Sequence, residues 1–471
     1  MKDNKLISLL KTLDERQWEK LEQFIRSPYF NQDQLVLLLL EQLVKCLGPL
    51  SPTKNAPLPP KAEFAAQLWP GKNYVAKDFN YVLSKLNKLV EQFLVLERLQ
   101  QSSLDWELAA LDLFSELQLP KHYRATERSL RKKLATPYED MLTTFKAKAQ
   151  LAEIEDQDYL RQKRRVHDFS IQEAALQLDR SYFLRRLQLA CSMLDRQHIF
   201  QLNYDPQISP AWIEHLHTHE AVQEPIIQLY LLIFEMLLEE QEESHFEVLT
   251  AKLKGVQELI TPKDLTEIYQ FAINYCARKI RSGREAYVGE ALKLYLTGID
   301  AGWLIINNEL SPWTYANVVK LFLRQKRFTE AESFIQRYLP LLPERFRENA
   351  FHYNAAELYY YTSAYEKAQE HLIQVAYDDL NYYLGARVLL AKIYWQTEAE
   401  DALSSLLAAF MMFLQRNKQL SRDLKNTYLN FCKILARILR TNPTDRAHLQ
   451  EVITATTPLT DRDWLLTIIQ T

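Results

Sequence analysis

The spacing of apolar residues over 311–418 predicts three consecutive helical hairpins, because apolar positions recur every three or four residues between short polar breaks. In each hairpin an alanine begins the second helix, and a bulky apolar residue follows four positions later. These pairs are Ala331 with Ile335, Ala368 with Leu372, and Ala402 with Leu406. The first helices carry apolar residues at matching places, namely Val319 and Phe322, Ala356 and Tyr359, and Leu390 and Ile393.

The three hairpins recur at a nearly constant interval. Ala331 and Ala368 are 37 residues apart, and Ala368 and Ala402 are 34 residues apart. An interval of about 34 residues is that of tetratricopeptide repeats, and the stretch resembles this family, whose hairpins stack into a right-handed solenoid. The resemblance implies an all-α fold in which each hairpin buries its apolar face against its neighbours. It also implies that the chain binds another macromolecule.

The apolar pattern along the whole chain predicts three parts. We expect an N-terminal helical domain over 1–104, an irregular helical middle region over 105–262, and a tetratricopeptide-like solenoid with C-terminal capping helices over 263–471. A proline-rich linker over 48–60 interrupts the first part. Proline after serine or threonine predicts the first turn of a helix. Such pairs occur at Thr136-Pro137, Ser209-Pro210, Thr261-Pro262, Ser311-Pro312 and Thr457-Pro458.

Glycine is scarce, with only 8 residues in a chain of 471. Glycine supplies the positive-φ turns, bulges and phosphate-binding loops that sheet-rich and nucleotide-binding folds need. Neither the dinucleotide-binding fingerprint nor the P-loop pattern occurs in the chain. The composition therefore strengthens the all-α prediction, and we expect no cofactor.

Charge and cysteine usage are typical of a cytoplasmic protein. The formal net charge is only -3, so the field of the whole chain neither attracts nor excludes nucleic acid strongly. We do not expect a nucleic-acid partner. The four cysteines have no spacing typical of a zinc or redox site and are expected to be small buried residues in a reducing compartment. No apolar run is long enough for a signal peptide or a membrane span. We expect no membrane partner, and the sequence leaves the oligomeric state open.

Part of the N-terminal region carries a second resemblance. Leu68-Trp69-Pro70, followed by a polar stretch and then by apolar residues at Leu83, Leu86 and Leu89, is similar to part of the winged-helix domain of bacterial transcriptional activators. In that family a β-hairpin wing follows the recognition helix, whereas here the helical pattern continues toward Leu104. The side chains that would meet DNA are Lys77, Lys85, Asn87 and Lys88, with Asp78 and Glu91 opposing them. The alternative is a long helix with a solvated lysine face.

The most specific candidate site is a row of amide side chains in the first helices of successive hairpins. An amide supplies a donor and an acceptor that match a peptide unit. The resemblance to tetratricopeptide proteins implies that such asparagines hold an extended peptide in a concave groove. We therefore predict a partner-binding groove formed by Asn317, Asn354, Asn274, Arg387, Lys320 and Tyr353. The alternative is that these amides bridge neighbouring helices inside the solenoid.

Two other polar clusters are interpreted as ordinary surface residues rather than as binding sites. His215 and His219 fall on one face of a predicted helix, but no third ligand has a convincing spacing, so we predict surface histidines and no metal site. The run 161–165 is cationic and could meet an acidic partner. Its acidic neighbours, which include Glu153, Glu155 and Asp158, predict a self-compensating surface instead.

No motif for nucleophilic or acid–base catalysis occurs in the chain, and we do not expect an enzyme. The sequence therefore predicts a non-enzymatic scaffold that binds an extended peptide or a helical protein partner in the groove of its solenoid. The alternative is a transcription regulator in which an N-terminal unit binds DNA and the repeats follow it.

Overall fold

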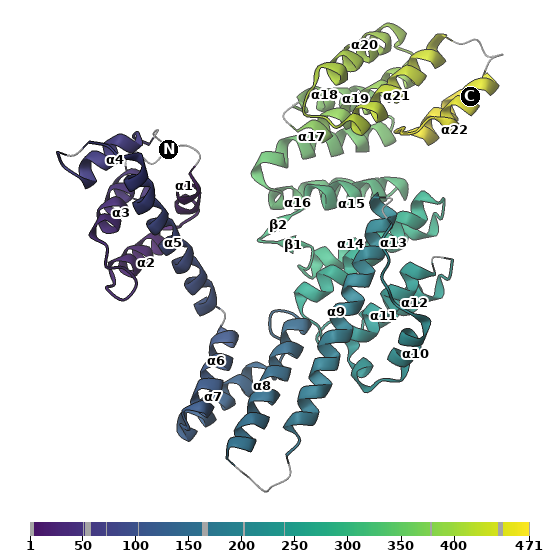
Figure 1. Cartoon of the computed structure of the whole chain (residues 1–471). Helices are drawn as coiled ribbons and strands as arrows, with labels where there is room; N and C mark the ends of the chain where they lie inside the picture. The colour runs from purple at the N-terminus through teal and green to yellow at the C-terminus, as the bar shows by residue number, and fades with distance from the viewer. Residues whose placement is uncertain are drawn as a thin grey trace. The chain divides into compact units, whose positions relative to one another are not determined.

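A computed structural model describes residues 4–49, 51, 58–71, 73–101, 103–162, 168–200, 203–239, 241–376, 379–440 and 446–470. Nearly every element is an α-helix, α1 to α23, which confirms the predicted all-α class (Figure 1). The chain divides into two compact units. Unit 1 is Met1–Tyr138 with Thr143–Asp179, and unit 2 is Glu139–Leu142 with Arg180–Thr471. The predicted domain boundaries and the right-handed solenoid stay predictions.

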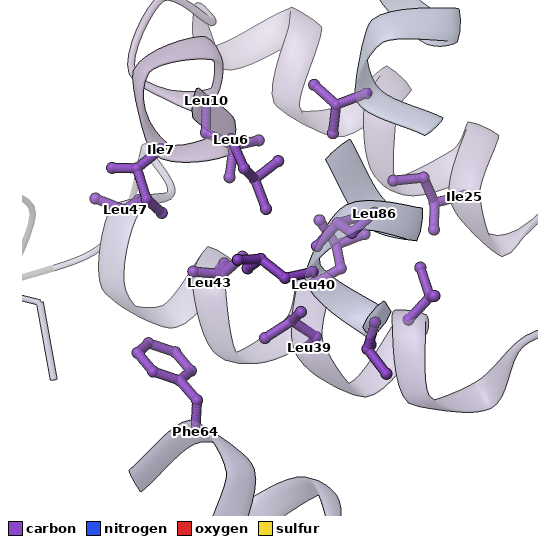
Figure 2. Close-up of a cluster of buried hydrophobic side chains, with 14 of the residues drawn as sticks. Leu6, Ile7, Leu10, Ile25, Leu39, Leu40, Leu43, Leu47, Phe64 and Leu86 are labelled. Atoms are coloured by element: carbon purple, nitrogen blue, oxygen red, sulfur yellow. The ribbon is translucent and has the colours of Figure 1, made fainter. Parts of the chain in front are cut away.

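The first five helices of unit 1 enclose one apolar core. The Asp14 side chain accepts a hydrogen bond from Gln17 N, while the Gln17 side chain accepts one from Asp14 N, so a reciprocal capping box begins α2. In Figure 2 side chains from α1 to α5, Leu6, Leu40 and Leu86 among them, converge on this core. The helices are α1 (Lys5–Leu10), α2 (Glu15–Arg26), α3 (Gln34–Leu47), α4 (Lys61–Leu68) and α5 (Ala76–Gln101).

The later helices of unit 1 share a second core. α6 (Ser103–Glu116) and α7 (Pro120–Lys133) form a hairpin, and α8 (Met141–Arg161) packs apolar side chains into the same cluster. α9 (Ser170–Phe200) follows, and the division between the two units falls within it. The core residues are Leu104, Leu108, Leu111, Tyr123, Leu130, Leu134, Ala147, Leu151 and Ile154.

Unit 2 continues with helices that pack on their neighbours along the chain, and α11 is the most deeply buried of them. A two-residue turn with positive φ at both Asn307 and Asn308 joins two short antiparallel strands, as a tight hairpin requires. The elements are α10 (Pro210–Thr218), the 3-10 helix η1 (Glu220–Gln223), α11 (Pro225–Leu238), α12 (Ser244–Leu253), α13 (Pro262–Arg281), α14 (Ala286–Asp300), β1 (Ile305–Ile306) and β2 (Glu309–Leu310).

The predicted hairpins are present in the second half of unit 2. α15 pairs with α16, α17 with α18 and α19 with α20, while α17 also contacts both α15 and α19. Ala331 and Ala368 are fully buried in the second helices, as the sequence pattern predicts. The elements are α15 (Pro312–Arg324), α16 (Phe328–Tyr338), η2 (Leu339–Leu341), α17 (Glu344–Tyr361), α18 (Tyr365–Gln374), α19 (Leu380–Gln396), α20 (Glu400–Arg416), α21 (Arg422–Arg440), α22 (Arg446–Ala455) and α23 (Arg462–Gln470).

Within the described residues, five helical hairpins share one type of turn. One residue between the two helices has a positive φ, and the N–H of the next residue donates to the carbonyl five positions before it, which is the Schellman arrangement. The positive-φ residues are Gln118, Gly283, Lys326, Ser363 and Glu398, and the bonds are Leu119 to Phe114, Arg284 to Lys279, Arg327 to Phe322, Ala364 to Tyr359 and Ala399 to Tyr394. Because one of these turns joins α6 to α7, this type of hairpin also occurs in unit 1.

The predicted helix starts are only partly correct. Pro210, Pro262 and Pro312 are each the first residue of a helix, as predicted. The predictions at Pro137 and Pro458 are wrong, because α8 begins at Met141 and α23 begins at Arg462. The Asp264 carboxylate, distant in sequence, accepts a hydrogen bond from Met141 N at 2.9 Å. The Arg462 guanidinium donates to the carbonyls of Ile453 and Thr456. At both places the chain makes other contacts where the local signature predicts a helix start.

The cysteines are unpaired thiols on apolar helix faces. Cys191, Cys276 and Cys432 are buried and Cys46 is partly buried. Burial raises the pKa of each thiol, that of Cys432 to about 12. No helix in the part of the chain that the structure describes is long and apolar enough to cross a membrane.

Candidate functional site

The exposed face of α15 carries the first group of candidate residues. Trp313, Asn317 and Lys320 are spaced by four and three positions, so they fall on one side of the helix. All three are exposed, and 58% of the Trp313 surface is accessible. The apolar residues Val318, Val319 and their helix neighbours face the core instead. α15 therefore presents an aromatic, an amide and a cationic group together.

A small polar cluster joins this face to α17. Tyr353 Oη donates to Glu357 Oε1 at 2.6 Å, which the spacing of four residues on one helix allows. Lys320 Nζ lies 3.8 Å from the same oxygen and 5.8 Å from the centroid of the Tyr353 ring. Burial and the Glu357 carboxylate raise the pKa of Tyr353, so the phenol stays protonated and donates. The predicted residues Lys320 and Tyr353 are thus brought together.

Gly385 on α19 makes room for the Tyr353 ring. A Cβ atom at this glycine would lie 2.9 Å from Tyr353 Oη and 3.0 Å from its Cε2 atom. Tyr382, near the start of α19, also contacts the ring, with the two centroids 5.6 Å apart. The position of the phenol is therefore fixed from two sides, by α19 and by Glu357.

Tyr361 completes the surface. It follows Glu357 by four positions on α17 and is 52% exposed. Burial of part of the ring and the nearby Glu357 carboxylate raise the pKa of Tyr361, while the positive charge of Arg324 on α15 lowers it. We use the name α15–α17 surface for the set Trp313, Asn317, Lys320, Tyr353, Glu357 and Tyr361.

The two asparagines that the sequence pattern singles out lie in different environments. Asn317 is exposed, and its Nδ2 donates to the hydroxyl of Tyr295 on α14 at 3.1 Å. Asn354 has an exposed fraction of 0%, and its Nδ2 donates to Ala350 O within α17 at 2.7 Å. Asn317 is therefore accessible to a ligand on this surface, whereas Asn354 is not. In this conformation Asn354 adds nothing to a row of exposed amides.

The remaining predicted residues contact side chains outside the α15–α17 set. Asn274 on α13 donates through Nδ2 to Asp195 Oδ2 on α9 at 2.9 Å, and Arg278 also binds this carboxylate. Arg387 on α19 lies over the ring of Tyr383, 4.7 Å from its centroid. Asn274 therefore bridges two helices, which is the arrangement that the alternative interpretation of the amides describes. The binding roles of Asn274 and Arg387 stay predictions.

The segment before α23 packs against α19 and α21. Lys392 on α19 forms an ion pair with Asp461 and lies over the Trp464 ring, 5.6 Å from its centroid. Asn430 on α21 donates through Nδ2 to Pro458 O at 2.9 Å. Phe431 also contacts Trp464. These contacts cover the last hairpin helices with the end of the described chain.

Sequence reasoning missed Glu357, Gly385 and Trp313, and it considered Tyr361 as an interface anchor but favoured packing between helices for it. Gly385 could have been identified from the sequence, because a glycine inside a predicted helix often marks a close approach by another group. Glu357 follows Tyr353 by the helical spacing of four, but nothing in the pattern indicated which face of α17 meets α15. The two aromatics were not separated from core aromatics because most residues of this type are buried.

The candidate DNA-contact residues lie on α5, which runs as one helix to Gln101. Lys85 is occupied by an ion pair with Asp33 at 2.9 Å, which raises the pKa of Lys85. Lys77 and Lys88 are exposed. No strand occurs in the described part of unit 1. The resemblance to winged-helix proteins stays a prediction.

The histidines of the cluster at 215–219 have ordinary partners. His219 Nδ1 accepts from Ala221 N at 3.1 Å and so caps η1, while His217 Nε2 lies 3.0 Å from Glu235 Oε1. Among the described residues, no three His, Cys, Asp or Glu side chains are grouped as metal ligands would be. Of the cationic run 161–165, residues 163–165 lie outside the described residues.

Comparisons of the chain with family models, with curated proteins and with solved structures gave no match. The chemistry available at the α15–α17 surface is therefore the basis for a functional conclusion. This surface offers aromatic contact area, a cation, a carboxylate and an amide.

Proposed function

We propose that this protein is a non-enzymatic scaffold that binds an extended peptide or a helix of a protein partner on the α15–α17 surface. One observation carries the proposal: two strongly exposed aromatic side chains, Trp313 and Tyr361, accompany a fixed cluster of hydrogen-bonding groups on the same two helices. Tryptophan and tyrosine contribute more binding free energy than most residues when a partner covers them.

The polar cluster supports binding because its geometry already exists before a partner arrives. Tyr353 and Glu357 share a hydrogen bond of 2.6 Å, and Lys320 Nζ lies 3.8 Å from the same carboxylate, so a partner loses little free energy in ordering Tyr353 and Glu357. Asn317 uses its Nδ2 for Tyr295, and no described residue donates to its Oδ1. This oxygen accepts an N–H of a peptide. The four free thiols of the chain are in keeping with the cytoplasmic location that forms part of the proposal.

The test compares two double variants of the full chain. Trp313→Ala with Tyr361→Ala removes the two aromatics of the surface. Trp106→Ala with Tyr182→Ala is the matched control, since these aromatics are 61% and 52% exposed but lie on α6 and α9. Quantitative mass spectrometry of affinity pull-downs from the source cell identifies proteins that the first variant loses and the control retains. Calorimetry with the purified protein identified in this way then measures the affinity.

We expect the surface variant to weaken binding by at least about 2 kcal/mol, roughly thirtyfold, because central aromatic residues dominate interfaces. The control should change the affinity by less than a factor of about two. Equal loss in both variants, or no loss in either, would contradict the proposal. Addition of Asn317→Ala to the control tests whether the amide contributes separately.

A further inference from the structure

A groove of about 920 Å³ lies in unit 1 between α7 and α8, beside the turn that joins α6 to α7. Arg124, Arg128 and Arg131 line its α7 wall, and Glu155, Tyr159 and Arg161 line its α8 wall. All the residues that line it belong to unit 1. We use the name α7–α8 groove for this feature.

α7 is strongly basic. It carries six lysine and arginine side chains and a single glutamate over Pro120–Lys133. Lys121, Arg124, Arg128 and Lys132 are spaced by three or four positions, so these exposed cations form a stripe along one side of the helix. The stripe is roughly 16 Å long at the usual rise of an α-helix.

The cations on α7 differ in how they are neutralised. Lys133 Nζ forms an ion pair with Glu107 at 2.7 Å. Arg131 binds Glu127 at 3.1 Å and Glu155 at 2.5 Å. Arg124 and Arg128 have no ion pair with any described residue. Positive charge is therefore left uncompensated on the upstream half of the stripe, where both arginines line the groove.

The acidic side chains of the α8 wall are already engaged. Glu155 is bound by Arg131, and burial raises its pKa to about 7. Asp158 accepts hydrogen bonds from Ser115 Oγ at 2.9 Å and from Gln162 Nε2. The two walls therefore differ in charge: α7 carries cations that have no ion pair with a described residue, whereas the carboxylates of α8 are already bound.

The groove also has an apolar and aromatic lining. Phe114 and Leu119 come from the α6–α7 turn region, Tyr123 from α7 and Tyr159 from α8. Leu119 is exposed, and Phe114 is only partly buried against the core of this hairpin. A ligand that covers these side chains gains apolar contact as well as charge pairing.

We propose that the α7–α8 groove binds an acidic amphipathic helix of a protein partner. Carboxylates on one side of that helix pair with Arg124 and Arg128, and its apolar side covers Phe114 and Leu119. A groove between two helices is a common binding site for such a segment. A nucleic-acid strand fits less well, because its phosphates recur along the whole strand, whereas Arg131 and Lys133 are already paired with Glu155 and Glu107. This site lies in unit 1 and does not depend on the function proposed for the α15–α17 surface.

The test uses the full chain and a fluorescently labelled synthetic peptide of 14 residues, the length of α7. The peptide carries glutamates along one helical side and leucines along the other. A second peptide has lysine in place of each glutamate, and a labelled oligothymidylate serves as the nucleic-acid probe. Fluorescence anisotropy measures the affinity of each probe at low and at high salt.

Two charge-reversal variants complete the design. Arg124→Glu with Arg128→Glu changes the groove, and Lys77→Glu with Lys88→Glu makes the same change of net charge on exposed positions of α5. Arg124→Gln with Arg128→Gln is a milder version that removes charge without reversing it. Circular dichroism and thermal melting verify that each variant folds.

We expect the acidic peptide to bind the unaltered protein and to lose about tenfold or more in affinity in the Arg124→Glu, Arg128→Glu variant. The glutamine variant should lie in between, and the α5 control should stay within about a factor of two. Added salt should weaken binding in the unaltered protein. Absence of binding, equal binding of the lysine peptide, or equal affinity in all variants would overturn the proposal. Tighter binding of the oligonucleotide that depends on Arg124 and Arg128 would overturn it in favour of nucleic acid.

Discussion

The α15–α17 surface and the α7–α8 groove both combine aromatic and charged side chains, but they compensate charge differently. On the α15–α17 surface the Glu357 carboxylate accepts a hydrogen bond from Tyr353 and faces the ammonium group of Lys320 at 3.8 Å. In the α7–α8 groove Arg124 and Arg128 have no acidic partner among the described residues. Polar groups that satisfy one another contribute to folding stability, whereas unpaired exposed charges contribute little and remain available to a ligand. The two regions should therefore respond differently to substitution.

The largest expected effect is that of Gly385→Ala on the α15–α17 surface. The new Cβ atom would lie 2.9 Å from Tyr353 Oη, so the phenol must move and its bond to Glu357 is strained or lost. We expect the free energy of unfolding to fall by about 2 kcal/mol, as for other overpacked sites. Urea denaturation followed by circular dichroism measures the change.

Gly289→Ala is the matched control for this substitution. In α14 the nearest group to the new Cβ atom is the flexible end of Gln325, at 3.1 Å, and alanine favours a helix more than glycine does. We expect unchanged or slightly greater stability. If Gly385→Ala is as stable as Gly289→Ala, the close packing of Tyr353 against α19 is not a constraint on this surface.

The next effect tests a feature that the two units have in common. Gln118 in unit 1 and Glu398 in unit 2 both hold a positive φ in the same hairpin turn. Glycine adopts this conformation without the steric cost that other residues have. Gln118→Gly and Glu398→Gly should therefore each raise the free energy of unfolding by about 1 kcal/mol in urea titrations.

A glycine substitution at the exposed helical residue Glu332 is the control for the two turn variants. Glu332→Gly in α16 should lower the free energy of unfolding by about 1 kcal/mol, because glycine is a poor helix former. If one turn variant gains stability and the other loses it, the α6–α7 hairpin is not energetically equivalent to the hairpins of unit 2.

The two units should also differ in their response to pH. In unit 2, His352 and His371 approach each other with their Nδ1 atoms 2.9 Å apart. Burial lowers the pKa of both, and His352 lowers that of His371 further, whereas Glu348 and Glu370 act weakly in the opposite sense. Below about pH 6.5 the unfolded chain therefore binds more protons than the folded chain. The free energy of unfolding should fall as the pH falls through about 6.5.

Thermal melting at about pH 7.5 and pH 5.5 checks this prediction. The loss of melting temperature on acidification should be smaller in a His371→Gln variant than in the unaltered chain. In unit 1 the expected pH dependence is opposite. Burial raises the pKa of Glu155 to about 7, so the contribution of the protonated carboxyl to stability is lost as the pH rises through that value. An equal acid response in the variant would show that the histidine pair does not carry the effect.

The smallest effect should come from the groove. Arg124→Gln with Arg128→Gln should change the free energy of unfolding by less than about 0.5 kcal/mol, because both arginines are exposed and have no ion pair with a described residue. Tyr353→Phe, by contrast, should cost about 1 kcal/mol through the lost bond to Glu357. A large loss from the arginine variant would mean that these charges serve the fold rather than a ligand.

The fold class could be predicted from the sequence because helical periodicity is a local property. Ala331, Ala368, Ile335 and Leu372 are buried where the pattern placed them. The site was harder to predict, because successive helix residues are rotated by about 100° and the pattern does not reveal which face a neighbour covers. Tyr353 is partly exposed while Asn354, the next residue, is fully buried.

The α7–α8 groove shows a second limit. The charge of α7 could have been read from Lys121, Arg124 and Arg128, since the spacing of these residues is visible in the sequence. The sequence does not reveal which of the α7 cations are neutralised, because Arg131 forms its ion pair with Glu155 on another helix. Long-range pairing of this kind depends on how helices pack and leaves no periodic trace.

The burial of the native thiols has a practical consequence for measuring motion. Thiol-reactive dyes and spin labels attack the thiolate, which raised pKa values and low accessibility keep scarce at Cys191, Cys276 and Cys432. Once the partly buried Cys46 is replaced by serine, cysteines introduced at the exposed turn positions Lys326 and Glu398 would therefore be labelled selectively. Distances between two such labels report whether neighbouring hairpins change their spacing when a partner binds.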